Sequence, residues 1–284
     1  MKTITYIHSG DSGDIIASLA AVKQYCGIHN IKARYILDAT GGMYNGSLDP
    51  YVAKQTIGKP NKFNKYMAEF IKPLIEKQSY IDSVEICDCA NHPRFDVNLN
   101  EFRRYFGDRE TLPTHRQNLL YLHQVTLGLP VGYQGPWMEC DTPPKDTDLV
   151  LFARSTRYQS AHVMISAILA GCERDHRQMG FVGTDLEYAC FQDAFKTSPK
   201  RIPVNDALEM ANVIAGAGAF VVNGTLAYWV ALATGKTQII HELGRDVDTT
   251  MFCRDDVPNL IYIEGSRFVT PKKKTVTPAQ SPDK

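Results

Sequence analysis

Two carboxylates and two glycines lie close together near the start of the chain, where residues 8–14 read His-Ser-Gly-Asp-Ser-Gly-Asp. An apolar run precedes this segment and apolar residues at helical spacing follow it, so we expect a strand, a glycine turn and a helix. The glycines would let the backbone approach a ligand, and the first N–H groups of the helix would bind an anion. A carboxylate there, Asp11 or Asp14, is stabilised as the anion and can act as a general base. Taken alone, these residues fit a capped helix and a permissive turn equally well.

Three further polar loops follow predicted strands in the second half of the chain. They are Arg154-Ser155-Thr156-Arg157-Tyr158, Gly183-Thr184-Asp185 and Asn223-Gly224-Thr225. Guanidinium groups pair well with phosphate oxygens, and a helix that begins after the third loop would offer N–H groups to a phosphate. Solvent-exposed arginines and an ordinary turn with a threonine cap are the alternatives. The G-x-x-G spacing of residues 10–13 matches neither the dinucleotide fingerprint nor the P-loop, which argues against a dehydrogenase and an NTPase.

Strands and helices are expected to alternate along both halves, a pattern typical of an α/β fold with largely parallel sheets. In the first half we expect strands at 4–7, 32–37, 84–86 and 95–99, and helices at 14–27, 61–78 and 114–127. In the second half we expect strands at 149–153, 179–182, 219–222 and 238–241, and helices at 160–171, 185–195, 206–217 and up to 234. The carboxyl ends of the two sheets would then face each other across a ligand-binding cleft.

A proline-rich segment separates these two halves. We assign residues 1–130 to a first Rossmann-like domain, 131–147 to a linker and 148–264 to a second Rossmann-like domain. Residues 265–284 contain prolines, a lysine run and few apolar side chains, so we expect a disordered tail.

The composition is that of an ordinary globular protein. The 284 residues include 31 basic and 31 acidic side chains, so no global attraction to nucleic acid or an anionic membrane is expected. Seven cysteines, an odd number, without a secretory signal indicate reduced thiols in the cytoplasm. No stretch approaches the roughly 18 apolar residues of a membrane span. Cys87, Cys89 and His92 fall short of a closed zinc site, which takes four ligands, so no metal is expected.

A basic and aromatic segment lies between residues 51 and 72. Lys62 and Lys65 are two of its five lysines. Such a surface suits a phosphorylated glycan, or DNA through its phosphates. The alternative is a solvated helix whose aromatic residues lie in the core, and the helical spacing of Phe63, Met67 and Phe70 favours it.

Four segments taken in order resemble the lipopolysaccharide heptosyltransferase family and its phage and bacterial relatives. Residues 8–20 are similar to the family opening S-x-G-D-x-x-x-S/T-L-P, and residues 154–158 look like its N-R-S-P-R-Y loop. Residues 181–185 resemble the strand that leads into the nucleotide pocket. Residues 222–228 resemble the segment that closes on the donor diphosphate. The order and spacing agree over residues 3–241.

The resemblance implies a GT-B fold, in which two Rossmann-like domains face each other and the second holds the nucleotide sugar. It implies inverting transfer without an obligatory metal or cofactor, from a nucleotide-diphosphate sugar to an acceptor hydroxyl, with Asp14 as the base. The second-half loops named above and Gly13 would bind the donor. The acceptor would contact the first domain, at His8, Asp11, Lys62 and Lys65.

The chain departs from the family at three positions, so the resemblance does not specify the sugar. Asn223 stands where heptosyltransferases carry aspartate, Tyr228 stands where they carry histidine, and no lysine follows Arg157. A glycosyltransferase that modifies hydroxymethylated pyrimidine in phage-type DNA is an alternative, since it would need a basic surface. A binding protein that keeps the nucleotide pocket without catalysis is another.

Overall fold

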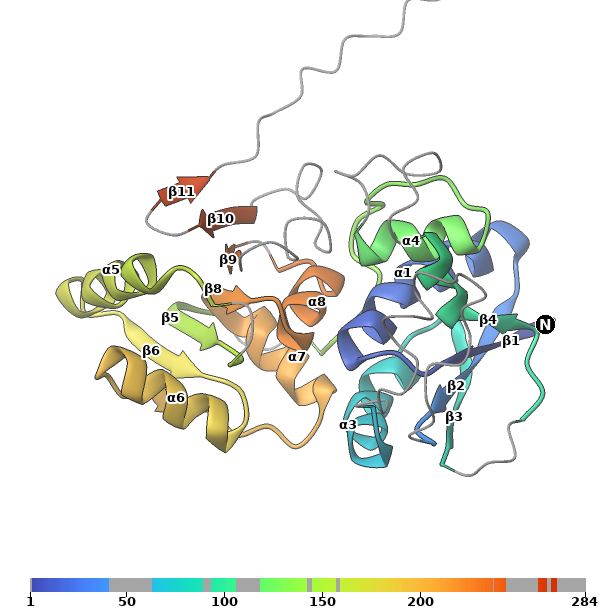
Figure 1. Ribbon diagram of the computed structural model, residues 1–284, viewed down its shortest axis with the longest axis horizontal. Coiled ribbons are helices and arrows are strands. Elements are labelled where there is room, and N and C mark those ends of the chain that lie inside the picture. Colours follow the sequence, from blue (N-terminus) through green and yellow to red (C-terminus); the bar gives the residue numbers. More distant parts are fainter. Residues whose placement is uncertain are drawn as a thin grey trace, which may run out of the picture.

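The computed structural model of the protein describes residues 2–40, 63–88, 93–105, 118–141, 145–156, 159–236, 238–243, 260–264 and 267–269. Two sheets stand side by side with helices packed between and around them (Figure 1). The strand order and helices confirm the predicted α/β class with two Rossmann-like halves. None of the helices in the described ranges is long and apolar enough to cross a bilayer.

The first sheet has four parallel strands in the order β3-β2-β1-β4. They are β1 (Thr3–His8), β2 (Lys32–Asp38), β3 (Ile81–Cys87) and β4 (Val97–Asn98). The helices of this half are α1 (Ser12–His29), α3 (Lys65–Glu76), the 3₁₀ helix η1 (Leu99–Tyr105) and α4 (Leu119–Thr126). The chain leaves β1 for β2 on one side and adds β4 on the other, so the topological switch point lies between β1 and β4.

The second sheet has the order β11-β10-β9-β8-β5-β6-β7. Its strands are β5 (Asp146–Ala153), β6 (Gln178–Phe181), β7 (Lys200–Arg201), β8 (Ala217–Asn223), β9 (Ile239–Glu242), β10 (Leu260–Glu264) and β11 (Arg267–Val269). All pairs are parallel except β10 with β11. The helices are α5 (His162–Arg174), α6 (Asp185–Phe195), α7 (Ala207–Gly216) and α8 (Leu226–Ala233). Here the switch point lies between β5 and β8.

The two halves share one hydrophobic core. Helix α1 packs against α8, and α3 packs against α7, so apolar side chains of both halves form a single cluster. The first turns of α1 and α8 meet where Gly13 contacts the indole of Trp229, which is 2% exposed. In Figure 1, α1 and α8 lie next to each other between the two sheets. The starts of these two helices are therefore close in space.

Residues 129–141, which we call the strap, lead from the first half to the second and pack against both. Trp137 donates its indole N–H to the Ile16 carbonyl in α1 at 2.9 Å, and its backbone N–H and that of Met138 donate to Ala233 at the end of α8, each at 2.9 Å. Both side chains are buried. The strap thus bonds to one helix of each half.

Several predicted boundaries need correction. Strand β4 ends at Asn98 rather than at residue 99, because the Asn98 carboxamide accepts the backbone N–H of Asn100 at 3.0 Å and turns the chain into η1. Helix α3 begins at Lys65 and α4 at Leu119, each after an asparagine cap. Strands β7, β10 and β11 were not expected. Strand β11 falls within the 265–284 segment, so the prediction of disorder is wrong at residues 267–269, and residues 270–284 lie outside the described ranges.

The contact between α1 and α8 leaves no room for a side chain at Gly13. A Cβ there would lie 2.9 Å from Trp229 Cδ1, whereas a Cβ at Gly27, in the same helix, would meet nothing within 4 Å. We expect Gly13→Ala to lower the free energy of unfolding by about 1–3 kcal/mol through overpacking. Gly27→Ala should be neutral or stabilising by up to about 1 kcal/mol. Urea unfolding of both variants checks this, and equal effects would contradict the proposed crowding.

Candidate active site

Asp14 occupies the third position of α1, at the switch point of the first sheet. The residue is 7% exposed, and the helix N-cap is Asp11, whose side chain makes no capping hydrogen bond. The simpler reading, in which Asp14 caps the helix, is not what the structure shows. Instead its Oδ2 accepts a hydrogen bond from Nη2 of Arg103 at 2.9 Å. The positive end of the helix dipole and the guanidinium both favour the ionised carboxylate.

Arg103 comes from η1, directly after β4. Its side chain is 21% exposed and that of Asp14 is 11% exposed, so the ion pair lies largely out of water. The guanidinium carbon stands 4.8 Å from the centre of the Phe102 ring, a cation–π contact. The carboxylate of the first loop therefore has a fixed, charged partner from the neighbouring strand end.

His8 is fully buried in a chain of hydrogen bonds beneath this pair. Its Nδ1 accepts the backbone N–H of Gly10 at 2.8 Å, and its Nε2 lies 3.1 Å from Nε2 of His123. Nδ1 of His123 lies 2.7 Å from the Leu119 carbonyl, so this nitrogen carries a proton. His8 must then donate through Nε2 to an unprotonated His123 Nε2, and both rings are neutral.

Burial lowers the pKa of His8 well below its ordinary value, and the nearby His123 and Arg103 lower it further. Burial also lowers the pKa of His123 to about 3, with the Leu119 carbonyl opposing this and Arg103 adding to it. His8 was predicted to bind the acceptor. In this structure the ring is 0% exposed and both of its nitrogens are hydrogen-bonded. His8 holds the Gly10 loop in place instead, and a Cβ at Gly10 would lie 2.5 Å from the ring.

In the second half, Arg154 makes a buried ion pair. Its Nε and Nη2 donate to the two carboxylate oxygens of Glu242 at 2.7 and 2.9 Å, and the two side chains are 4% and 1% exposed. Glu242 also accepts the backbone N–H groups of Ser160 and Ala161 at 2.7 and 2.9 Å. We had expected Arg154 to bind the donor diphosphate. In this structure its guanidinium pairs with Glu242, which also binds the loop at the end of β5.

Asn223 bridges the switch point of the second sheet. Its Oδ1 accepts the N–H of Ser155 at 3.0 Å and its Nδ2 donates to the Ser155 carbonyl at 3.1 Å. An aspartate here could accept the first bond but could not donate the second. The carboxamide of Asn223 therefore makes a bond that the aspartate of the heptosyltransferase pattern could not make. Tyr228, a second departure, is 0% exposed and stacks on His241 with ring centres 4.2 Å apart.

The remaining second-half loops begin helices. Thr184 caps α6 in a reciprocal capping box with Glu187, and the exposed Asp185 pairs with Arg201. Thr225 caps α8 by accepting the N–H of Ala227 at 3.2 Å, and Gly224 precedes it. Arg157 lies outside the described residues. The structure thus brings Ser155, Asn223 and Thr225 together at one switch point and places Thr184 and Asp185 at the end of the neighbouring strand, β6.

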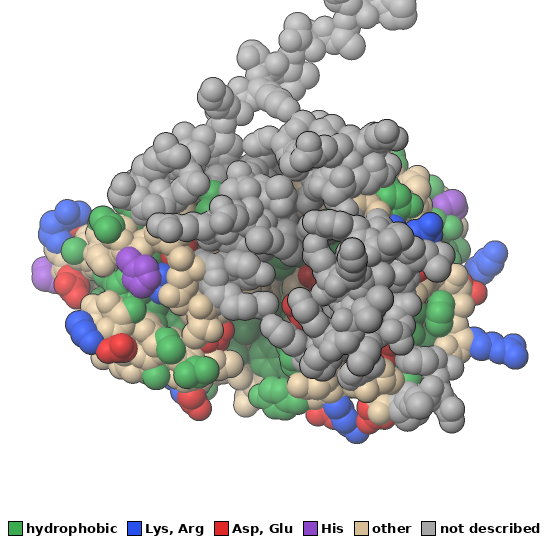
Figure 2. All heavy atoms as spheres, in the orientation of Figure 1, with side chains coloured by type: hydrophobic (Ala, Val, Ile, Leu, Met, Phe, Trp, Pro, Cys, Tyr) green, Lys and Arg blue, Asp and Glu red, His purple; other side chains and the backbone are tan. Residues whose placement is uncertain are grey.

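The basic segment is only partly described. Phe63 is 0% exposed, as expected for a core aromatic, while Tyr66 is 76% exposed. Lys65 pairs with Asp88 at 2.8 Å, and Lys62 lies outside the described residues. On the described part of the face in Figure 2, basic and acidic side chains alternate and form no continuous basic area.

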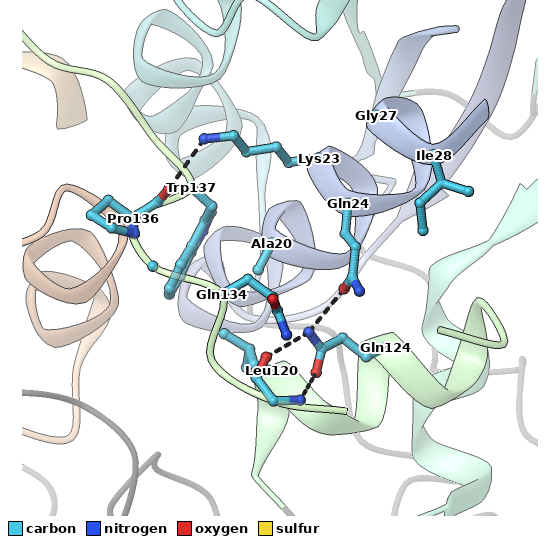
Figure 3. A pocket seen from close by; sticks show the side chains of 12 residues that line it. Ala20, Lys23, Gln24, Gly27, Ile28, Leu120, Gln124, Gln134, Pro136 and Trp137 are labelled. Atoms are coloured by element: carbon cyan, nitrogen blue, oxygen red, sulfur yellow. Dashed lines mark hydrogen bonds between the residues drawn. The ribbon is translucent and has the colours of Figure 1, made fainter. Parts of the chain in front are cut away.

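A cavity of about 340 Å³ lies at the other end of α1, between this helix, α4 and the strap. Figure 3 shows Lys23, Gln24, Gln124 and Trp137 around it, with Lys23 donating to the Pro136 carbonyl. None of the site residues discussed above lines this cavity. Within the described ranges, no group of three or more His, Cys, Asp and Glu side chains is placed to hold a metal. Cys89 and His92 fall outside those ranges.

Four residues of the site carried no sequence signal. Arg103, His123, Asn100 and Glu242 bind Asp14, His8, Ser9 and Arg154, respectively, across 88 to 115 positions of sequence. Asn100, Arg103 and Glu242 lie at or just after strand ends, which could have suggested them, whereas His123 lies within α4. Nothing in the spacing could have paired them.

No protein-family model matches the sequence, and no curated protein is similar to it at a significant level. Solved structures do match. A glycosyl transferase family 9 protein from Veillonella parvula has a TM-score of 0.61 at 11% identity over 93% of this chain and 86% of its own. E. coli ADP-heptose lipopolysaccharide heptosyltransferase II has a TM-score of 0.59 at 10% identity over 93% and 90%. E. coli heptosyltransferase WaaC, solved with ADP-2-deoxy-2-fluoro heptose, has a TM-score of 0.55 at 12% identity over 91% and 94%. These matches confirm the predicted GT-B fold.

The neutral histidine pair predicts a loss of stability in acid. Both histidines have folded-state pKa values below the ordinary 6.5, so the unfolded chain takes up protons first as the pH falls. Each should cost about 2 kcal/mol of unfolding free energy between pH 7 and pH 5. We expect His123→Gln, which can still accept from His8, to lose about 2 kcal/mol less than wild type over this range in urea unfolding. An unchanged pH dependence would contradict a neutral His123.

Two arginine ion pairs of the second half, one buried and one exposed, should respond differently to loss of the arginine charge. Arg154→Met leaves Glu242 buried without its partner and should lower the unfolding free energy by about 3–5 kcal/mol. Arg201→Met removes a pair with the exposed Asp185 and should cost less than about 1 kcal/mol. Thermal and urea unfolding measure both. If both variants lost less than about 1 kcal/mol of unfolding free energy, Arg154 would not be needed for stability, and donor binding would again be the favoured role.

Proposed function

We propose that the protein transfers a sugar from a nucleotide-diphosphate sugar to an acceptor hydroxyl, with Asp14 as the general base. The GT-B fold supports this, since the similar structures include transferases, one of them solved with an ADP-sugar analogue. Fold alone does not define a reaction. The observation that carries the proposal is the buried, ion-paired carboxylate of Asp14, placed at a switch point beside the first turn of α8.

In the proposed step, Asp14 takes the proton of the acceptor hydroxyl while the oxygen attacks the anomeric carbon. The bond between that carbon and the diphosphate oxygen breaks, and the nucleoside diphosphate leaves with the electron pair. A single displacement inverts the anomeric centre. The leaving charge would be met by the N–H groups at the start of α8 and by the Ser155 loop that Asn223 holds.

The donor class can be found by measuring thermal stabilisation with a panel of nucleotide-diphosphate sugars, since a bound ligand raises stability by mass action. Nucleotide release with and without candidate acceptors then distinguishes a transferase from a non-catalytic binding protein. Stabilisation by a donor without release under any acceptor would favour the binding protein.

Replacing the base should separate catalysis from binding. We expect Asp14→Asn to lower the transfer rate by about 10²–10⁴-fold, because the amide cannot accept the hydroxyl proton. Donor affinity should change little. The matched control is Asp82→Asn, an exposed aspartate on β3, which should transfer at the wild-type rate. A fully active Asp14→Asn would remove the base assignment.

A further inference from the structure

Arg103 is the residue of this site that no motif predicted. It lies 89 positions from Asp14 in the sequence, yet its Nη2 is 2.9 Å from the carboxylate Oδ2. The two backbones are held in register independently of this pair. Strand β4 pairs with β1, and the Asn100 carboxamide accepts the N–H of Ser9 at 3.0 Å. Both bonds fix η1 against the loop that carries Asp14.

The surroundings of the pair restrict how its charges can be neutralised. His8 on β1 and His123 on α4 face it as neutral rings, and Asp11 lies in the same loop. From α8, the uncharged Trp229 contacts the first turn of α1. Phe102 lies beneath the guanidinium. Arg103 thus supplies a positive charge directly against the Asp14 carboxylate.

We propose that Arg103 is a positioning residue for the base: it keeps Asp14 ionised and holds its carboxylate in place at the start of α1. This inference rests on the proposed function. The bond to Oδ2 restricts the rotation of the carboxylate, so the base is held in one orientation. Geometry of this kind contributes to rate because the reacting atoms are aligned before reaction.

Pairing with Arg103 also makes Asp14 a weaker base than an unpaired carboxylate would be. An arginine partner stabilises the carboxylate and weakens it as a proton acceptor. Proton transfer to Asp14 would therefore be favourable only as the hydroxyl oxygen forms its bond to the anomeric carbon. The pair would hold the base ready at neutral pH and suppress proton uptake before the sugar is in place.

The test measures the titration of Asp14 directly, by carboxyl ¹³C NMR of the full-length protein, with the Asp14 signal assigned from Asp14→Asn. We expect Arg103→Met to raise the proton affinity of Asp14 about tenfold or more, and Arg103→Lys to restore most of the wild-type value. The control Arg104→Met removes the neighbouring arginine, which pairs with Glu101 at the surface, and should change nothing. Should Arg103→Met fail to fold, Arg103→Gln removes the charge and keeps a hydrogen-bond donor.

Kinetics give the second readout, using a donor and acceptor found as described above. Arg103→Met should lower kcat at least tenfold with little change in the KM for the donor, and should move the acid limb of the kcat/KM profile to higher pH. If Arg103 only stabilised the fold, its replacement would leave the acid limb of the kcat/KM profile at the wild-type pH. An unchanged Asp14 titration in a folded Arg103→Met protein overturns the inference and leaves the transferase assignment intact. Absence of transfer by wild type, with the Asp14 titration still shifted, overturns the proposed function instead.

Discussion

The packing of α1 against α8 is the constraint on which the arrangement of this protein depends. Each helix begins at the carboxyl end of a strand that borders a topological switch point, one in each sheet. Because Gly13 and Trp229 touch, the two helix starts are neighbours, and so are the loops before them. Polar residues that are more than 200 positions apart in the sequence thereby come to face one region. A side chain larger than hydrogen at Gly13 would push the two starts apart.

The two halves stabilise their switch points by the same device. In each, an asparagine side chain from the end of one bordering strand or just beyond it binds the backbone at the end of the other. Asn100 accepts the N–H of Ser9, and Asn223 accepts the N–H of Ser155, both at 3.0 Å. Parallel strands separate at their ends once the ladder stops, and an amide side chain replaces the missing backbone bond. The two switch points differ in their polar groups: the carboxylate of Asp14 follows the loop after β1, and the cap residue Thr225 follows Asn223 after β8.

How much the sequence could predict depended on whether a feature is local. The strand–turn–helix at residues 4–27 and the bounds of α6 follow from periodicity and capping within a few residues. The partners of Asp14 and Arg154 do not, because each is chosen by sheet order. An arginine at the end of a strand looks the same in sequence whether it binds a phosphate or a buried glutamate. Burial decides this, and it belongs to the whole fold. Strand β7 was missed for a related reason, since Lys200 and Arg201 are exposed at an edge and carry no apolar signal.

The strap and α8 also hold the chain's whole complement of tryptophan. The sequence contains two, Trp137 and Trp229, and both are 2% exposed at the junction between the halves. One bonds to the Ile16 carbonyl through its indole, and the other contacts Gly13. Intrinsic fluorescence excited at the red edge of the indole band consequently comes from this junction alone. The unmodified protein thus carries its own optical reporter of the contact between its two halves.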